Sequence, residues 1–360
     1  LALQGGGVHG AFTWGVLDLL LADEDIEPGW LSGTSAGAVN ALAVAHGLAH
    51  GDRALARTTL EAIWRSVESS GVPDLLRLNP FLSGLATAAT LPNLTGLISP
   101  YSFNPLRFDP LRGVLEQHID FDAVRRKCPV DVMIAATDIG TGRARIFRRN
   151  EITVDAVLAS ACLPTLHHAV EIDGRHYWDG GFSANPDLVT LASESPVEDT
   201  LLVQLNPIQD AGLPTSARDI EDRVNTITFN QPLMQDIETI LLARESKPGW
   251  FGGQRGRLAR LKQHRFHLIE AGMHTAGLGS GSKSVPDNGL LTYLHGAGRI
   301  EAGRWLLRHK SDIGRIATVD LAETYRGGES CAAVPEPNAT DEPEGDAIAP
   351  SASSRVALRR

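Results

Sequence analysis

Cysteine is scarce in this sequence, with three residues among 360. Cys128, Cys162 and Cys331 stand far apart and are odd in number. Such usage fits a reducing compartment better than a disulfide framework, which needs paired cysteines at regular spacings. We therefore expect a cytoplasmic protein.

Positive charge and long apolar runs are also lacking. Lys and Arg number 33 against 43 Asp and Glu, so the formal net charge is −10 and we expect no nucleic-acid partner. No window reaches the ~20 uninterrupted apolar residues of a membrane span, because the most hydrophobic long stretch, 81–98, is broken by Gly, Pro and Asn. No signal peptide is predicted, since the first residues resemble a core strand, although the chain begins with Leu rather than Met.

What the sequence contains is an alternation of strand and helix patterns. Short apolar runs predict strands at 1–4, 30–32, 130–137, 144–148, 170–173, 175–178, 201–205 and 266–269. Longer periodic segments predict helices at 11–22, 36–50, 60–67, 154–161, 217–245 and 290–309. This alternation predicts an α/β fold with a mainly parallel sheet covered on both faces.

The chain is expected to form one domain over 1–325, in which 210–320 is a C-terminal helical extension. Prolines interrupt the apolar segment 70–110, which predicts a cap or flap, with a core-packing excursion as the alternative. The segment 327–360 is rich in Pro, Glu, Asp, Ala and Ser and is predicted to be a disordered acidic tail.

The clearest motif is GTSAG at 33–37, between a predicted strand and a predicted helix. In a G-x-S-x-G motif the serine stands on a sharp turn that exposes its hydroxyl, and the glycines remove Cβ clashes. The motif therefore predicts Ser35 as a nucleophile supported by Gly33 and Gly37. The simpler interpretation is a small-residue turn with an incidental serine.

A glycine-rich loop, GGGVHG, follows the first predicted strand at 5–10. If Ser35 attacks a carbonyl, the backbone N–H groups of this loop are suited to hold the oxyanion. The loop also matches the dinucleotide pattern G-x-G-x-x-G, which needs an acidic residue about 20 residues further on, at the end of the second strand. Asp23 and Asp25 precede that strand instead, and the strand ends in the serine motif, so the oxyanion interpretation is favoured. It assigns the oxyanion hole to Gly5, Gly6 and Gly7.

A base for the serine is suggested by YWDGG at 177–181. Asp179 follows a predicted strand and enters a turn at Gly180 and Gly181, which can present a carboxylate rigidly. An Asp-Gly pair alone normally marks a hairpin turn, but the following FSANP does not resemble a second hairpin strand.

Together, QGGGVHGAF, GTSAG and DGG, in this order, resemble the bacterial patatin-like phospholipase family. The resemblance extends through VDVMIAATDIGTGRARIF, ASACLPTL and YWDGGFSANP, over roughly residues 1–320. It implies a three-layer α/β/α fold and a lipid acyl hydrolase with a Ser35–Asp179 dyad, which would react through an acyl-serine intermediate. Because the segment 81–98 is apolar without forming a span, we expect it to make transient peripheral membrane contact. The segment 81–98 would cover the acyl-chain site. His9 and Gly10 complete the glycine-loop motif, and His9 stands where the family often has Arg or Lys.

Two alternatives remain open from the residues alone. The first is a Ser–Asp–His triad, for which the candidate histidines are His264, His267, His274 and His295, each more simply a surface or packing residue. His167 and His168 are candidates for lining the site. The second is a lipid- or partner-binding module with little turnover.

Other reactive residue types give weaker signals. Ser160 and Cys162 in ASACLP are predicted to pack against the wall of the site, because Cys162 lacks a neighbouring positive charge that would lower its pKa. Histidines and acids do not fall at metal-ligand spacings, so neither a metal nor another cofactor is expected.

Overall fold

A computed structural model describes residues 1–69, 99–104, 109–208, 212–246, 256–276, 278 and 287–327. Most of the cap or flap predicted at 70–110, including 81–98, lies outside these residues. The tail predicted at 327–360 also lies outside them, except for Gly327.

An eight-stranded sheet forms the centre of the described structure, in the order β5-β6-β3-β2-β1-β7-β8 with β4 beside β3. The parallel strands are β1 (Ala2–Leu3), β2 (Leu31–Thr34), β3 (Val132–Asp138), β7 (Asp199–Gln204) and β8 (Arg265–Glu270). Two strands run antiparallel to β3, namely β4 (Ala144–Arg148) and β6 (Arg175–Asp179), and β5 (Val170–Ile172) is antiparallel to β6. The strand predictions and the mainly parallel sheet are confirmed.

The helices surround this sheet. The first group is α1 (Gly10–Ala22), α2 (Ala36–Ala49), α3 (Arg53–Ser69), α6 (Pro100–Phe103), α7 (Pro110–His118), α8 (Phe121–Lys127) and α9 (Val154–Ser160). The second is α10 (Leu188–Glu194), α11 (Ala217–Glu245), α12 (Arg257–Gln263), α13 (Met273–Ala276), α14 (Asn288–His309) and α15 (Leu321–Arg326). Within the described ranges, none of these helices is both long and apolar enough to cross a bilayer.

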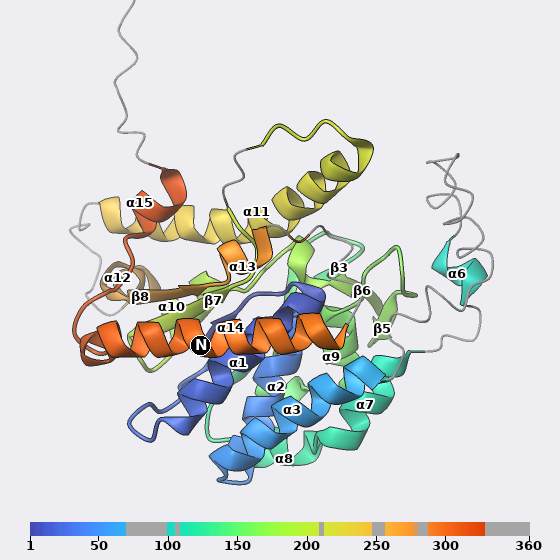
Figure 1. The fold of residues 1–360 in the computed structure, drawn as a ribbon, viewed down its shortest axis with the longest axis horizontal. Coiled ribbons are helices and arrows are strands. Elements are labelled where there is room, and N and C mark those ends of the chain that lie inside the picture. The colour runs from blue at the N-terminus through green and yellow to red at the C-terminus, as the bar shows by residue number, and fades with distance from the viewer. Residues whose placement is uncertain are drawn as a thin grey trace, which may run out of the picture.

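Side-chain alternation along the strands divides the core into two clusters. Leu3 and Ile134 belong to a cluster with α1, α2, α3, α7, α8, α9 and α14. Their neighbours Ala2 and Met133 belong to a second cluster with α10, α11, α12 and α15. Because successive strand residues point to opposite faces, the two helix groups must cover opposite faces of the sheet. The fold is therefore the predicted three-layer α/β/α arrangement (Figure 1).

The long helix α14 packs across α1 (Figure 1). A Cβ on Gly15 would stand 2.0 Å from the carbonyl oxygen of His295, and a Cβ on Gly298 2.1 Å from that of Phe12. Glycine at both positions lets the two backbones approach closely. Helix α14 thereby shares a core with the N-terminal half of the chain.

Candidate active site

One strand, β3, brings the predicted serine and aspartate segments together. Residues Ala135 and Ala136 pair with β4 on one edge of β3. On the other edge Ala135 pairs with Thr34, the last residue of β2, and Ala136 pairs with Asp179, the last residue of β6. Strands β2 and β6 therefore end facing each other beside adjacent residues of β3. Ser35 follows directly after Thr34.

Ser35 occupies a strained turn between β2 and α2. Its φ is 54° and its ψ is −123°, a conformation that side-chain-bearing residues rarely adopt. The Ser35 N–H donates to the hydroxyl of Ser160 at 2.9 Å, and Ala38 and Val39 donate to the Ser35 carbonyl oxygen. These bonds hold the turn in place, and Ser35 itself is only partly buried. This is the geometry expected of a nucleophile elbow at a helix N-terminus.

The glycines of the serine motif are required by close backbone contacts. A Cβ on Gly33 would lie 2.4 Å from the carbonyl oxygen of Gly37, and a Cβ on Gly37 would lie 2.1 Å from that of Leu3. Both distances are far below van der Waals contact, and both neighbours are backbone atoms that cannot rotate away. The first turn of α2 can therefore pack against β1 only when these positions carry no side chain.

Gly37→Ala is expected to lower the free energy of unfolding by about 3 kcal/mol or more, because the backbone of α2 or β1 must shift. Gly113→Ala is the matched control, since Gly113 is exposed on α7 and a Cβ there meets nothing within 4 Å. That control is expected to be neutral or stabilising by about 0.5–1 kcal/mol. Urea unfolding of both variants measures the difference, and equal stabilities would contradict the packing argument.

Asp179 is fixed by its backbone and buried by its surroundings. Its N–H donates to the carbonyl oxygen of Cys162 at 2.8 Å, and its carbonyl oxygen accepts from the Thr137 hydroxyl at 2.7 Å. The residue is 1% exposed. Its Oδ1 accepts the Gly181 N–H at 2.7 Å, whereas its Oδ2 has no partner of normal hydrogen-bond geometry among the described residues.

Burial raises the pKa of the Asp179 carboxyl from 3.8 to about 7, against the smaller lowering effects of the Gly181 N–H and the Ser35 side chain. The pairing of Thr34 and Asp179 with adjacent residues of β3 places the Ser35 segment beside this carboxyl. A pKa near neutrality suits a group that must accept a proton and then return it.

The glycines after Asp179 have packing roles of their own. A Cβ on Gly180 would lie 2.2 Å from the carbonyl oxygen of Ala135, which would push the turn away from β3. A Cβ on Gly181 would lie 2.3 Å from the ring of Phe229 on α11. The turn therefore sits between β3 and α11, and this contact keeps Asp179 from moving away from the end of β2.

The glycine loop approaches Ser35 closely but does not offer three equivalent donors. A Cβ on Gly5 would lie 2.9 Å from the Ser35 Cβ and 2.8 Å from the carbonyl oxygen of Thr34. The N–H of Gly5 is already donated to Asn185 Oδ1 at 2.8 Å, and Gly5 is buried. Gly6 is partly buried and Gly7, with φ 57°, is exposed. Gly6 and Gly7 are thus the loop's candidate oxyanion donors, and Gly5 drops out of the three donors predicted from the sequence because its N–H is already bonded.

A network of buried amides that the sequence analysis did not identify holds this loop. Gln4 Oε1 accepts the N–H groups of Leu205 and Asn206, at 2.7 Å and 2.9 Å. Gln4 Nε2 donates to Asn230 Oδ1 at 3.2 Å, and Asn206 Nδ2 donates to the Gly5 carbonyl oxygen at 3.3 Å. The residues that directly follow β1 and β7, together with Asn230 on helix α11, therefore fix the loop jointly.

His9 and Gly10 lie where the loop enters α1. His9 is 1% exposed, and its side chain makes no capping hydrogen bond to the helix. A Cβ on Gly10 would stand 2.7 Å from the Ala36 Cβ, so glycine here lets the starts of α1 and α2 meet. The positive ends of two helix dipoles consequently converge beside Ser35.

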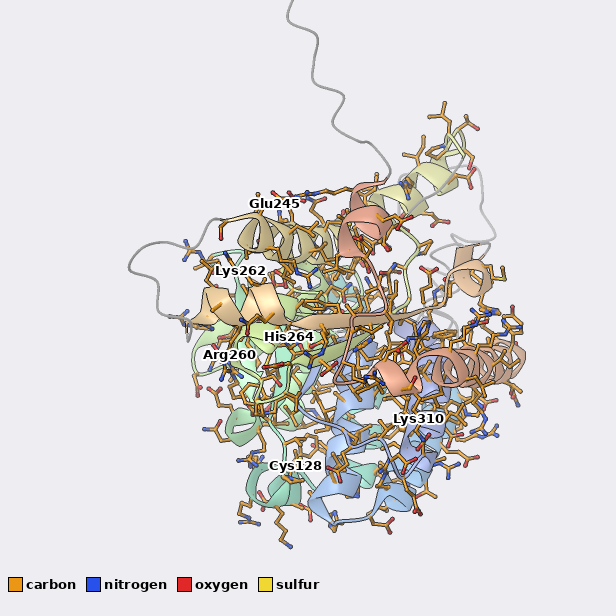
Figure 2. All side chains as sticks on the ribbon, turned by 90° about the vertical axis from the view of Figure 1, so that its left-hand side faces the viewer. Cys128, Glu245, Arg260, Lys262, His264 and Lys310 are labelled. Atoms are coloured by element: carbon orange, nitrogen blue, oxygen red, sulfur yellow. The ribbon has the colours of Figure 1, made fainter. Side chains whose placement is uncertain are left out.

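The histidines considered for a triad bond elsewhere. His264 bonds Thr200, and His267 bonds Asp199, both at the ends where β7 and β8 begin. Figure 2 shows His264 close to Arg260 and Lys262, beside the start of β8. The other two lie near α14, where His274 bonds Tyr293 and His295 stacks on Trp14. Of the two after Pro164, His168 bonds the carbonyl oxygen of Pro100.

The acids that the dinucleotide interpretation needs are also engaged elsewhere. Asp23 and Asp25 both pair with Lys310, with N–O distances of 2.7 Å, beyond the C-terminal end of α1. Lys310 is labelled in Figure 2. Neither acid stands at the end of β2, where a ribose would be held.

Ser160 and Cys162 differ in what they contribute to the wall of the site. Ser160 does more than pack, because its hydroxyl fixes the Ser35 N–H. Burial and the nearby Asp179 raise the pKa of the Cys162 thiol to about 12, so the thiol stays protonated and unreactive. Within the described ranges, no group of three or more His, Cys, Asp or Glu could hold a metal ion.

A strained serine turn at the end of a parallel strand, inside a three-layer α/β/α fold, is the arrangement of serine hydrolases. The family model described as "Patatin-like phospholipase" matches residues 1–192, and the chain belongs to this family. The description of this family is that of a phospholipase, which is a hydrolase of acyl lipids.

Other known proteins add little. No curated protein matches the sequence. Among solved structures, the chain is similar to that in "Crystal structure of VipD from Legionella pneumophila", with 14% identity and a TM-score of 0.34. The match covers 85% of this chain and 66% of the VipD chain, just under two thirds of its length.

Proposed function

We propose that the protein cleaves carboxylic ester bonds of phospholipids or related acyl lipids, with Ser35 as nucleophile and Asp179 as general base. The observation that carries this proposal is the pairing of a strained, partly exposed Ser35 with a buried carboxyl whose pKa lies at about 7. An ordinary carboxylate, with a pKa near 4, is a poor base for an alcohol. Burial raises the pKa of Asp179 to about 7, which makes its carboxylate a stronger base.

In the acylation step Ser35 Oγ attacks the ester carbonyl carbon while its proton passes to the carboxylate of Asp179. The N–H groups of Gly6 and Gly7, with the N-termini of α1 and α2, stabilise the negative charge on the carbonyl oxygen. The C–O bond to the leaving alcohol then breaks, and Asp179 returns the proton to that oxygen. Water attacks the acyl-serine in the same manner, and the products are a free fatty acid and regenerated Ser35.

Two other functions are less well supported. A Ser–Asp–His triad needs a histidine bonded to both partners, and the candidate histidines make the contacts described above instead. A binding module without turnover gains nothing from a buried carboxyl at Asp179. Ionising that group at neutral or higher pH costs folding stability, and lipid binding alone does not require it.

Covalent labelling with an alkyl fluorophosphonate tests the proposal directly. The wild-type chain is expected to carry one phosphonyl adduct on the peptide that contains Ser35, as mapped by mass spectrometry. In parallel, mixed phospholipid vesicles are expected to release free fatty acids. An adduct on another residue, or labelling without any lipid product, would contradict the assignment.

A further inference from the structure

Asn185 is a buried side chain that joins two segments of the site. It is 0% exposed, and it lies in FSANP, six residues after Asp179. Its Oδ1 accepts the Gly5 N–H at 2.8 Å, and its Nδ2 donates to the carbonyl oxygen of Phe229 at 2.9 Å. Since an N–H can only donate and a carbonyl can only accept, the orientation of the amide is fixed by its two partners.

The bond to Asn185 determines how the glycine loop is oriented. The N–H of Gly5 is held by Asn185 and its carbonyl oxygen by Asn206, so both peptide units that flank Gly5 are fixed. The unit whose carbonyl oxygen Asn206 holds also carries the Gly6 N–H, and the next unit along the chain carries the Gly7 N–H. Glycine by itself has wide backbone freedom, so these side-chain bonds are what limit the directions available to the donors at Gly6 and Gly7.

The second hydrogen bond of Asn185 connects it indirectly to Asp179, the proposed base. It holds the backbone of Phe229, and the ring of Phe229 fills the space where Gly181 has no side chain. Gly181 in turn donates its N–H to Asp179 Oδ1. One buried amide therefore connects the oxyanion loop on one side with the turn that carries the carboxylate on the other.

We propose that Asn185 is a positioning residue, which aims the Gly6 and Gly7 N–H groups at the oxyanion by fixing the Gly5 peptide. This inference rests on the proposed ester hydrolysis. Asn185 acts through Gly5 and does not touch the substrate. Misplacing donors by about 1 Å, or losing one, costs on the order of 10²-fold in rate.

The test compares Asn185→Ala with Asn40→Ala. Asn40 is also 0% exposed and makes two side-chain hydrogen bonds, to the Gly10 carbonyl oxygen and from Trp64 Nε1, but none to residues 5–7. With a short soluble ester, Asn185→Ala is expected to lower kcat by about 10²-fold with little change in KM. Asn40→Ala is expected to lose comparable stability and to keep kcat within a few-fold of wild type.

A second readout separates positioning from a merely structural role. An alkyl trifluoromethyl ketone forms a tetrahedral oxyanion on a catalytic serine, so its affinity reports the oxyanion donors. Asn185→Ala is expected to weaken this inhibitor in proportion to its loss of kcat, whereas Asn40→Ala leaves the affinity unchanged. A wild-type inhibitor affinity in Asn185→Ala, or an equal loss in both variants, would overturn the proposal.

Two further measurements keep the outcome interpretable. If Asn185→Ala does not fold, Asn185→Asp still offers an acceptor to the Gly5 N–H. At pH 6, with the new carboxyl protonated, its O–H can also donate to the Phe229 carbonyl oxygen, so the variant is expected to retain most of the inhibitor affinity that wild type has at that pH, and loss of that affinity in a folded protein would contradict the proposal. If the wild-type chain itself takes up no fluorophosphonate and hydrolyses no ester, the proposed function is wrong. If the wild type is active and Asn185→Ala has the same kcat and inhibitor affinity, the proposed function stands and only the role of Asn185 is wrong.

Discussion

Ser35→Ala is expected to abolish ester hydrolysis, with a loss of kcat on the order of 10⁴- to 10⁶-fold, because the nucleophile is gone and no neighbouring group can replace it. Cys162 stays protonated, with its pKa raised to about 12. Ser160 is 0% exposed and its hydroxyl is bonded to the N–H of residue 35. The variant should also take up no fluorophosphonate, which intact-protein mass spectrometry measures.

Ser35→Gly provides a matched control for the strained turn. The φ of 54° and ψ of −123° at Ser35 strain any residue that has a Cβ, so alanine keeps the strain and glycine relieves it. Part of the relief is offset by the greater freedom of glycine in the unfolded chain. We expect Ser35→Gly to be more stable than Ser35→Ala by about 1 kcal/mol in urea unfolding, and both to be inactive.

These two variants address separate parts of the assignment. Residual turnover in both would mean that another residue forms the acyl intermediate. Equal stability of the two would mean that position 35 is not held in the strained conformation. The elbow and the nucleophile are therefore tested independently in one pair of proteins.

The parallel part of the sheet was predictable because its central strands are buried on both faces and read as continuous apolar runs. The run at 130–137 predicts β3 well, and its antiparallel partner at 144–148 is confirmed. The first strand is shorter than predicted, since only Ala2 and Leu3 pair with β2 and β7 before the chain enters the glycine loop. The packing of α14 on α1 was not predictable, because Gly15 and Gly298 do not indicate which helix each one meets.

The site was predictable where a local motif carries the chemistry and not where distant residues meet. The GTSAG pattern indicates Ser35 by itself, the role of Asp179 in DGG follows from the family resemblance, and the pairing of β2 and β6 with β3 explains why the two segments meet. The support from Asn185 and Ser160 spans 180 and 125 residues of sequence. An asparagine in FSANP resembles an ordinary turn residue, and nothing local reveals that it bonds the first loop of the chain. For the same reason the sequence could not show that the Gly5 N–H is already bonded to Asn185, and so is not a free oxyanion donor.

Asp179→Asn is expected to lower kcat by about 10³- to 10⁴-fold while making the protein more stable at high pH. An amide cannot accept the proton of Ser35, which accounts for the lost rate. The stability gain follows from the raised pKa. A carboxyl whose pKa is about 7 when folded and 3.8 when unfolded favours the native state below pH 3.8, and this contribution is lost as the pH rises through 7.

The size of the gain follows from the same shift. Holding the ionised carboxylate in the folded protein costs ~4 kcal/mol well above pH 7. An asparagine avoids that cost but buries an amide N–H₂ where Oδ2 has no partner, at a cost of about 1–3 kcal/mol. Asp179→Asn should therefore be about 1–3 kcal/mol more stable than wild type at pH 9, and the advantage should vanish by pH 5. Urea unfolding at the two pH values measures it.

Asp236→Asn is the control that separates a buried acid from a catalytic base. Burial and the charge of Asp187 raise the pKa of Asp236 to about 7, and its carboxylate accepts the N–H groups of Leu188 and Val189 at the start of α10. An asparagine oxygen can accept the same bonds. This variant is expected to gain stability at high pH as Asp179→Asn does, but to keep wild-type kcat.

The pH dependence of the wild-type reaction completes this prediction. Because the base must be ionised before Ser35 attacks, kcat/KM is expected to rise about tenfold per pH unit below 7 and to level off above it. Asp236→Asn should keep this profile, since the titration belongs to Asp179. A plateau that extends down to pH 5 would mean that the base ionises near the ordinary pKa of a carboxyl group. In that case burial does not raise the pKa of Asp179 in the active enzyme, and the observation that carries the proposed function would be lost.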